Sequence, residues 1–472
     1  MNELSRRAAL KSVGGASTGG ADWPPGWQTL QHGIAVGRYT DPAFLKLEFE
    51  KLWSRVWQVA ARVDEVPEPG DFTTYDIGQR SVIVVRADKD TIKAYHNVCP
   101  HRGTALGVGS GTYERSQIMC PFHGWRWNLA GEIQYVLERQ EFRGGQLKDS
   151  DCALKEVAVR IYAGFVFINF DKNPESFDDF IAPIRQLLDD LAIGDMHHIW
   201  WKSIAVPANW KVAQEAFFEG YHVPATHPQL EPAGCEVVTG IRSAEGFHFS
   251  HHNVFYENFA HGHGRFFGGK KTPMAGHVAD PTADPVEAMA GRLQLLVDGM
   301  DAMILQQDVD LIRSLKGKPI PAGSSLGGEY VKALYSNAAA ERRPMPKPVP
   351  EIIGQWGGEV VLFPNFMILP QAGNAMMYRV RPHATDPNQC TFEIYSTRTL
   401  PAAVKPPRAT VQPVTDTSDP AQVLLIPRQD LGNIPRMQKG LQTGGIRNIY
   451  LAAEQEKIIL NHHQELDRYL QS

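Results

Sequence analysis

The sequence has few cysteines for its length and no long apolar run. Five cysteines occur among 472 residues, which is too few and too odd a number for a disulfide scaffold. We therefore expect a reducing compartment, and the cytoplasm fits best. No run of about 18 apolar residues is present, so the sequence offers no transmembrane helix and we expect no membrane partner.

An excess of charge of one sign is also lacking. The chain has 47 Lys and Arg residues against 52 Asp and Glu residues, for a net charge of −5. This balance argues against a protein that binds nucleic acid through phosphate attraction. The glycine-rich stretches lack the strand, helix and following acid of a dinucleotide site. Small molecules and other proteins are the expected partners.

The first residues lack an apolar segment. The stretch "SRRAALKS", residues 5–12, resembles a twin-arginine export signal, but "VGGASTGGADWPPG" after it has no apolar core of the kind that such a signal needs. We interpret residues 1–39 as an N-terminal tail with a helical segment.

The remaining chain is long enough for two domains. Short alternating strands separated by turn residues predict an all-β unit over residues 40–170. Apolar residues at helical spacing predict a helix within 176–192, and residues 171–472 mix helices with β-rich segments. The sequence therefore predicts an α+β protein.

Two short motifs in the all-β unit carry metal-ligand residues. Cys99 and His101 form C-x-H, Cys120 and His123 form C-x-x-H, and 18 residues separate the two pairs. Zinc fingers usually pair Cys with Cys and His with His, and they place one pair on a helix. The mixed order, with glycines between, favours a [2Fe–2S] cluster in which the cysteines hold one iron and the histidines the other. A zinc knuckle remains the alternative.

A second group of possible ligands lies about a hundred residues downstream, in "NWKVAQEAFFEGYHVPATH", residues 209–227. Helical spacing predicts Glu215, Glu219 and His222 on one face. Pro224 is expected to end the helix and return His227 toward His222. Two histidines and one carboxylate form the facial triad of non-haem Fe(II) oxygenases, which leaves iron positions open.

These motifs together resemble a known family. "CPHRG" and "CPFHGW" resemble the Rieske motif, and the downstream stretch resembles the mononuclear iron motif of the large (alpha) subunits of Rieske non-haem iron oxygenases, the aromatic-ring-hydroxylating dioxygenases. The resemblance implies a [2Fe–2S] cluster held by the two motifs and a mononuclear Fe(II) held by His222 and His227. It implies a third iron ligand far downstream, for which Asp430 in "RQDLGNIPRMQKGL" is the candidate.

The resemblance leaves several acids to assign. Asp430 is expected just before a helix whose first turn contains Pro435, although such an acid could equally be an N-terminal cap. Asp308 and Asp310 are the fallback, and we interpret them more readily as a solvated helix face. Glu219 corresponds to a family residue, often Asp, that connects a Rieske histidine to an iron histidine across a subunit boundary. An ordinary exposed helix acid is the alternative there.

The family implies the rest of the architecture and activity. We expect an all-β Rieske [2Fe–2S] domain at 40–170, inserted near the N-terminus, and a catalytic iron domain at 171–472 with an antiparallel sheet and helices, of helix-grip or START-like type. We expect a terminal oxygenase that uses O2 and electrons from NAD(P)H, delivered by a separate reductase or ferredoxin. A homotrimer, or an α3β3 assembly with a small beta subunit, is implied by the resemblance.

The substrate is expected to be an aromatic or hydrophobic ring compound, hydroxylated and by preference dihydroxylated, as in aromatic hydrocarbon catabolism. Monooxygenation or O-demethylation uses the same ligands and remains open. A non-catalytic Rieske electron carrier would have no need of the second motif, and a zinc-stabilised binding module is a further alternative. Aromatic residues that could line a pocket more often fill cores: Phe217, Phe218, Phe266, Phe267 and Trp356.

Three further features are weaker. The stretch from His248 to Lys271 is rich in His, Gly and aromatic residues, and is either a pocket-lining loop or a plain surface loop. Arginines near the cluster motifs could dock an acidic electron carrier or could be solvated loop charge: Arg102, Arg115 and Arg126. Three cysteines are expected to be small buried hydrophobes: Cys152, Cys235 and Cys390.

Overall fold

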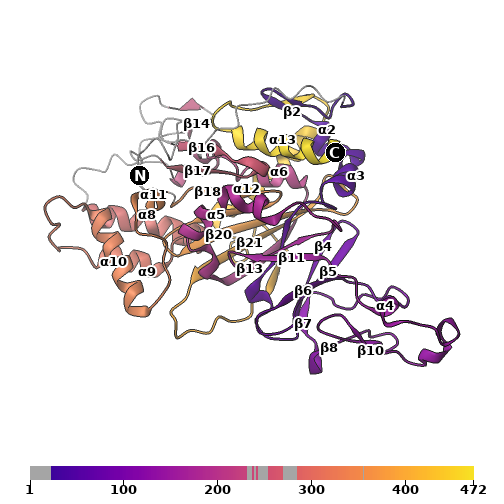
Figure 1. Ribbon diagram of the computed structural model, residues 1–472. Helices are drawn as coiled ribbons and strands as arrows, with labels where there is room; N and C mark the ends of the chain where they lie inside the picture. The colour runs from indigo at the N-terminus through magenta and orange to yellow at the C-terminus, as the bar shows by residue number, and fades with distance from the viewer. Residues whose placement is uncertain (1–22, 231–236, 239–240, 243–253, 269–283, 355) are drawn as a thin grey trace, which may run out of the picture.

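The computed structural model describes residues 23–230, 237–238, 241–242, 254–268, 284–354 and 356–472. The arginine pair near the N-terminus, Cys235, and residues 248–253 and 269–271 of the His-rich stretch lie outside these residues. The described part of that stretch forms two strands, Val254–Asn258 and Gly264–Gly268, so the expectation of a loop is wrong there. The α+β class expected from the sequence is confirmed. In Figure 1 the strands of residues 58–169 form the lower right of the molecule, and the helices of residues 285–341 lie at the left.

The all-β unit consists of three small antiparallel sheets. The first has the order β11-β12-β3, the second β6-β5-β4-β7 and the third β10-β9-β8. Short strands joined by tight turns are what the alternating pattern predicted. Their bounds are β3 Gln58–Arg62, β4 Asp71–Ile77, β5 Arg80–Arg86, β6 Ile92–His96, β7 Ser110–Thr112, β8 Gln117–Met119, β9 Arg126–Asn128, β10 Ile133–Tyr135, β11 Ala158–Tyr162 and β12 Phe165–Asn169.

An eight-stranded sheet organises the second unit. Its order is β16-β17-β18-β19-β20-β21-β13-β22, and every pair is antiparallel except β13 with β22. The strands are β13 Met196–Val206, β16 Val254–Asn258, β17 Gly264–Gly268, β18 Glu359–Leu362, β19 Phe366–Pro370, β20 Asn374–Pro382, β21 Cys390–Thr399 and β22 Val411–Val414. Strands β20 and β21 are buried at almost every position, so both faces of the sheet are covered.

Helices cover one face of this sheet and extend to one side of it. They are α5 Phe177–Asp190, α6 Trp210–Glu215, α7 Val223–Thr226, α8 Pro285–Met300, α9 Gln306–Arg313, α10 Leu326–Glu341, α11 Pro350–Ile353, α12 Leu425–Gln442 and α13 Lys457–Gln471. Helix α5 is the helix expected within 176–192, and the hydroxyl of Ser176 caps it by accepting from Asp179 N. None of the helices in the described part of the chain is long and apolar enough to cross a membrane.

The N-terminal segment packs on the second unit. It contains β1 Thr29–Leu30, β2 Gly33–Ala35, α2 Gly37–Thr40 and α3 Pro42–Lys51, and β2 pairs with β23 Asn448–Tyr450 near the C-terminus. Helix α3 starts with the carboxylate of Asp41 accepting from Ala43 N and with Pro42 in its first turn. The minor elements are α4 Asp149–Cys152, β14 Val237–Val238 and β15 Ile241–Arg242.

The two units share a hydrophobic core. The largest cluster of buried apolar residues includes strands β3, β5 and β12 as well as β13, β18, β20 and β21. Polar bonds reinforce this contact: the Arg379 guanidinium donates to Ala60 O at 2.5 Å, and His198 Nδ1 lies 2.8 Å from Asp64 Oδ1. A second cluster surrounds Cys99 and Cys120, so the cysteine motifs sit on a core of their own.

Arg379 is held on the sheet face that meets the all-β unit. Its Nε donates to Glu393 Oε2 at 2.7 Å, and Arg381 Nε donates to the same oxygen at 3.1 Å. Burial alone would raise the pKa of Glu393, but the two guanidinium charges lower this pKa to about 2. The carboxylate therefore stays ionised between the two arginines and fixes this face of the sheet.

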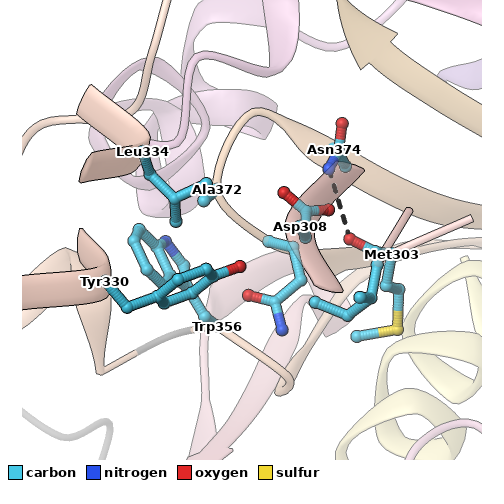
Figure 2. A pocket seen from close by; sticks show the side chains of 9 residues that line it. Met303, Asp308, Tyr330, Leu334, Trp356, Ala372 and Asn374 are labelled. Carbon is cyan, nitrogen blue, oxygen red and sulfur yellow. Dashed lines mark hydrogen bonds between the residues drawn. The ribbon is translucent and has the colours of Figure 1, made fainter. Parts of the chain in front are cut away.

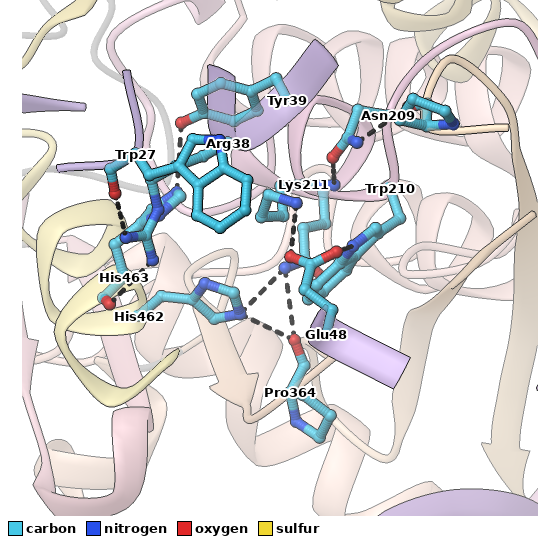
Figure 3. A network of polar contacts seen from close by, with 12 residues as sticks. Trp27, Arg38, Tyr39, Glu48, Asn209, Trp210, Lys211, Pro364, His462 and His463 are labelled. Atoms are coloured by element: carbon cyan, nitrogen blue, oxygen red, sulfur yellow. Dashed lines mark hydrogen bonds and ion pairs between the residues drawn. The ribbon is translucent and has the colours of Figure 1, made fainter. Parts of the chain in front are cut away.

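A buried polar network joins α2 and α3 to α6 and α13 (Figure 3). The Lys211 ammonium lies 2.6 Å from Glu48 Oε1, and Trp210 Nε1 donates to Glu48 Oε2 at 3.0 Å. The Tyr39 hydroxyl donates to Glu215 Oε2 at 3.0 Å, and His463 Nε2 lies 2.8 Å from Glu215 Oε1. These bonds fix the helix that leads into the second group of candidate ligands.

Candidate metal centres

The two cysteine motifs fold into loops with the same hydrogen bonds. Cys99 N donates to Thr104 O at 2.8 Å and Cys99 O accepts from Gly103 N at 2.9 Å. In the second loop Cys120 N donates to Trp125 O at 2.9 Å and Cys120 O accepts from the following glycine N, four residues on, at 3.0 Å. Both glycines have positive φ, 82° and 69°, which only glycine adopts readily. The glycine of each motif therefore sets the loop that presents its ligands.

The four side chains of these loops lie together at one end of the all-β unit. Both cysteines are buried, Cys99 at 2% and Cys120 at 1% exposure. The rings of His101 and His123 have centroids 4.5 Å apart, and Trp125 stacks on His101 at 5.0 Å. His101 Nδ1 is buried and has no hydrogen-bond partner among the described residues. An unpaired ring nitrogen beside two buried thiols fits a bound cluster.

The second group of candidate ligands meets across elements far apart in sequence. His222 immediately precedes α7 and His227 immediately follows it, whereas Asp430 lies on α12. Their ligand atoms all lie within 4.8 Å of one another, and each can offer one atom to a metal ion. His227 Nε2 is 3.0 Å and His222 Nε2 is 3.6 Å from Asp430 Oδ1. Two imidazoles and one carboxylate in this arrangement fit a facial triad.

Two further side chains orient the histidines. His222 Nδ1 donates to Glu219 Oε1 at 2.8 Å, and the other oxygen of Glu219 accepts from His222 N at 2.9 Å. His227 Nδ1 donates to Gln429 Oε1 at 2.9 Å. Each ring therefore carries its proton on Nδ1 and turns Nε2 toward Asp430, as metal-binding histidines do when an acceptor holds the other nitrogen.

Charge also favours a cation at this point. Burial lowers the pKa of His222, but the hydrogen bond to Glu219 and the negative charges of Glu219 and Asp430 outweigh burial and raise this pKa. His227 is 3% and Asp430 is 4% exposed. A carboxylate that far from water needs a cationic partner. The donor set thus fits a mononuclear iron.

The helix geometry expected around these residues is wrong in three places. Helix α6 ends at Glu215, so this residue does not share a helical face with Glu219 and His222. Pro224 lies in the first turn of α7 and does not end a helix. Helix α12 begins at Leu425, so Asp430 lies within this helix and not before it. The short turn of α7 brings His227 back toward His222.

The fallback acids lie elsewhere. Asp308 Oδ2 accepts from Leu305 N at 2.8 Å, which caps α9, and its side chain lines a small cavity of about 10 Å³ (Figure 2). Asp308 is 5% exposed, so the interpretation of a solvated helix face is wrong for this residue and holds for Asp310. Trp356 lines the same cavity, which is too small for an organic substrate.

The other aromatic candidates divide between core and site. Phe218 is fully buried and packs against His462 at 5.3 Å between ring centroids, so it belongs to the core. Phe217 packs against Tyr378 at 4.3 Å, near the triad. Phe267 stacks on Phe255 at 5.7 Å. As expected, two of the remaining cysteines are buried: Cys152 and Cys390.

Sequence reasoning missed two residues at this site. Gln429 adjoins the candidate ligand Asp430, and its partner His227 lies 202 residues away in the sequence. Glu359 is 3% exposed on β18, and burial together with the charges of Asp430 and Glu219 raises its pKa. A single acid inside the otherwise apolar stretch "EVVLFPNFMILP" was the available signal.

Comparison with known proteins agrees with this geometry. Residues 56–148 match the Rieske [2Fe-2S] domain, and residues 193–472 match the ring hydroxylating alpha subunit (catalytic domain). Fold and site thus define a protein with a [2Fe–2S] domain and a mononuclear iron domain. The chain belongs to the Rieske non-haem iron oxygenase family, among the ring-hydroxylating alpha subunits.

Individual relatives are more distant. The glycine betaine monooxygenase oxygenase subunit of Pseudomonas aeruginosa is 29% identical over 211 residues, which is 44% of this chain and 48% of that protein. The anthranilate 1,2-dioxygenase large subunit of Acinetobacter baylyi is 33% identical over 201 residues, 41% of this chain and 42% of that protein. The matched part of the chain thus spans about half the length of these relatives or less.

Solved structures confirm the fold over nearly the whole chain. The quaternary ammonium Rieske monooxygenase CntA in complex with gamma-butyrobetaine superposes with a TM-score of 0.61 at 16% identity. The match covers 95% of this chain and 99% of that one. At this identity the similarity establishes the architecture only.

Proposed function

We propose that the chain is the terminal oxygenase component of a Rieske monooxygenase that acts on a small organic ammonium compound. The observation that carries the proposal is the meeting of His222, His227 and Asp430 within 4.8 Å in a chain that also has a Rieske [2Fe–2S] domain. An electron carrier or a zinc-stabilised binding module would have no use for this second site.

The residues divide into two ligand sets. The cluster set consists of Cys99, His101, Cys120 and His123, and the iron set consists of His222, His227 and Asp430. When bound, the cluster supplies single electrons and the Fe(II) activates O2. The chain itself fixes the tautomers of both iron-site histidines through Glu219 and Gln429, and buries the carboxylate that holds the metal charge.

The type of oxygenation is supported by the relatives. Glycine betaine monooxygenase and a quaternary ammonium monooxygenase lie among the similar proteins, which favours monooxygenation of an ammonium compound. The second candidate is dihydroxylation of an aromatic ring, which the anthranilate 1,2-dioxygenase large subunit favours. Both reactions use the same metal ligands, so the substrate pocket has to distinguish them.

Electrons have to come from another protein. The sequence has no dinucleotide fingerprint, so we infer that NAD(P)H is oxidised by a separate reductase, with or without a ferredoxin. Arg102 and Arg126 are exposed near the cluster loops, and each stacks on an exposed aromatic ring, Phe122 at 5.4 Å and Tyr135 at 5.3 Å. These cationic and apolar side chains suit an acidic electron carrier.

A trimer, with or without a beta subunit, is part of the proposal. Within one chain the cluster loops and the iron site lie on different units (Figure 1). Exposed apolar side chains flank both centres: Phe122 is 59% exposed beside His123, and Tyr221 is 55% exposed beside His222. Such side chains fit contacts with a neighbouring subunit, where a Rieske histidine would face Glu219 and His222.

Metal analysis and isotope labelling test the proposed function. Protein purified without oxygen is expected to hold about three irons and two acid-labile sulfides per chain. With reductase, glycine betaine and ¹⁸O2, one labelled oxygen atom is expected on the hydroxylated N-methyl carbon, which leaves as formaldehyde when its C–N bond breaks, and the other is expected in water. Anthranilate that gains two labelled atoms would instead establish the second candidate. Zinc without sulfide would contradict both.

Glu219→Ala is expected to retain the cluster and the iron while slowing electron transfer between them. The variant loses the acceptor that holds His222 Nδ1, so single-turnover oxidation of the reduced cluster should slow by at least about tenfold, as for other residues that orient metal ligands. The measurement is the decay of the reduced-cluster spectrum after O2 and substrate are added.

Two variants control this experiment. Glu219→Asp keeps a carboxylate acceptor and should recover part of the rate. Glu50→Ala removes an exposed glutamate that pairs with Lys46 at 3.7 Å, and this variant should behave as wild type. Cluster oxidation at the wild-type rate in Glu219→Ala would refute the bridging role.

A further inference from the structure

Glu359 is a buried residue with an unpaired carboxyl oxygen. It opens β18, is 3% exposed, and its Oε1 has no partner among the described residues. Buried polar groups are nearly always paired, so an unpaired carboxyl oxygen in a folded protein requires an explanation. A ligand that the protein binds is one explanation, and the surroundings of Glu359 decide what kind.

The sheet register places Glu359 in a row of aromatic residues. Phe266 on β17 pairs directly with Glu359, and Tyr256 on β16 pairs directly with Phe266. Directly paired residues point to the same face of a sheet with their Cβ atoms about 5 Å apart. The rings of Tyr256 and Phe266 have centroids 5.6 Å apart. The carboxyl group thus lies at the end of an aromatic row.

This row faces the iron site. The Tyr256 hydroxyl accepts from Gly220 N at 3.2 Å, next to Glu219. Tyr378, on the same face of the sheet, packs against Phe217 at 4.3 Å, and its hydroxyl donates to the sulfur of Met376 at 3.3 Å, its one recorded acceptor in the described part of the chain. Its hydroxyl is therefore weakly held beside the triad.

Among the residues that the structure describes, no cationic side chain pairs with this carboxyl group. The charges that act on Glu359 are those of Asp430 and Glu219, and together with burial they raise its pKa well above the usual range. Arg265 precedes Phe266 in the sequence and therefore points to the opposite face, where it pairs with Glu257 at 2.7 Å. Since the described part of the chain offers Glu359 no cationic partner, a cation carried by a bound ligand is a candidate for this role.

We propose that Glu359 is a specificity-determining residue that pairs with the ammonium group of the substrate, with Tyr256 and Phe266 providing aromatic faces for its methyl groups. Cations that carry methyl groups are bound in proteins by aromatic rings, and a nearby carboxylate adds charge attraction. A neutral substrate of the same shape would leave the carboxyl group unpaired, so the pocket would discriminate against it. This inference rests on the proposed function and deepens it.

The test compares a cation with its neutral isostere. Glycine betaine and 3,3-dimethylbutanoate share shape and carboxylate and differ only in nitrogen against carbon. Calorimetric titration of the holoenzyme is expected to give at least about tenfold tighter binding of glycine betaine, since a pocket built for a polar partner rejects the analogue that lacks it. Glu359→Gln, which keeps the shape of the side chain, should remove this preference.

Matched variants keep the result interpretable. Glu257→Gln alters a glutamate of the adjacent region that points to the other face, and it should retain the preference. Glu359→Asp should retain part of it and serves if the glutamine variant does not fold, as judged from the cluster spectrum. KM should rise in Glu359→Gln, because the variant loses a contact that the ammonium group makes in the bound substrate.

Each outcome gives a decision. Loss of the cation preference in Glu359→Gln alone supports the inference. An unchanged preference in this variant, or equal binding of both compounds by wild type, overturns it. These results are independent of the metal, sulfide and ¹⁸O measurements, which test the oxygenase function separately from the role of Glu359.

Discussion

Asp430→Ala is expected to abolish turnover while leaving the cluster intact. The variant removes the one carboxylate among the three candidate iron ligands and leaves His222 and His227 to hold the metal by themselves. Loss of a residue that merely orients a ligand costs roughly 10–100-fold in metal affinity or activity, so loss of the ligand should cost more than about 100-fold. The iron content should fall toward that of the cluster, and the cluster spectrum should persist.

The fallback acids provide the control for this prediction. Asp310→Ala removes an exposed acid, and Asp308→Ala removes the cap of α9 without touching the triad. Both variants should keep the mononuclear iron, although Asp308→Ala should unfold about 1 kcal/mol more easily, because it loses a helix cap. Full iron content and turnover in Asp430→Ala would show that another residue holds the iron.

The sequence predicted which residues lie together at the candidate iron site but not the elements that carry them. The prediction took Pro435 as the first-turn proline of a helix that follows Asp430. The helix begins at Leu425, so the proline in its first turn is Pro427. Asp430 lies instead on the buried stripe that also contains Ile426 and Ile434. An acid within an apolar stripe was the better signal, because burial requires a partner.

The cluster loops were predictable because their information is local. A cysteine, a proline, a histidine and a glycine within six residues specify each loop, and the backbone bonds of each loop close within the same residues. The partners of Gln429 and Glu215 were not predictable, because His227 and Tyr39 reach them across 202 and 176 residues. Long-range pairs of this kind depend on the packing of the whole sheet and its helices.

Glu215 illustrates how packing overrides local spacing. Its position on a helix suggested a shared face with Glu219, but the helix ends at Glu215. The side chain of Glu215 belongs instead to the buried polar network that joins α2 and α3 to α6 and α13. There the side chain lies between Tyr39 and His463, and burial raises its pKa to about 8. The residue therefore supports the scaffold behind the iron site and not the iron itself.

The pair Glu48 and Lys211 within this network gives the largest expected effect on stability. Both side chains have 0% exposure, and their charged atoms lie 2.6 Å apart. The Lys211 ammonium also lies 4.9 Å from the ring of Trp210. Removing one member of a buried ion pair typically destabilises a protein by about 3–5 kcal/mol, since the other charge remains buried and unpaired. Lys211→Met should therefore lower the melting temperature by several degrees.

The double variant separates the charge from the packing. Glu48→Gln with Lys211→Met leaves no charge to bury and keeps an oxygen that accepts from Trp210 Nε1. Replacing both members of a buried pair is often neutral, so the double variant should recover most of the lost stability. Calorimetric melting of the holoenzyme measures the melting temperatures of the single and the double variant.

Helix α6 leads directly into the segment of Glu219 and His222. The single variant should therefore lose its mononuclear iron at a lower temperature than the temperature at which it loses its cluster. A single variant as stable as wild type would mean that the ion pair adds nothing to stability and that packing alone holds α6 against α3.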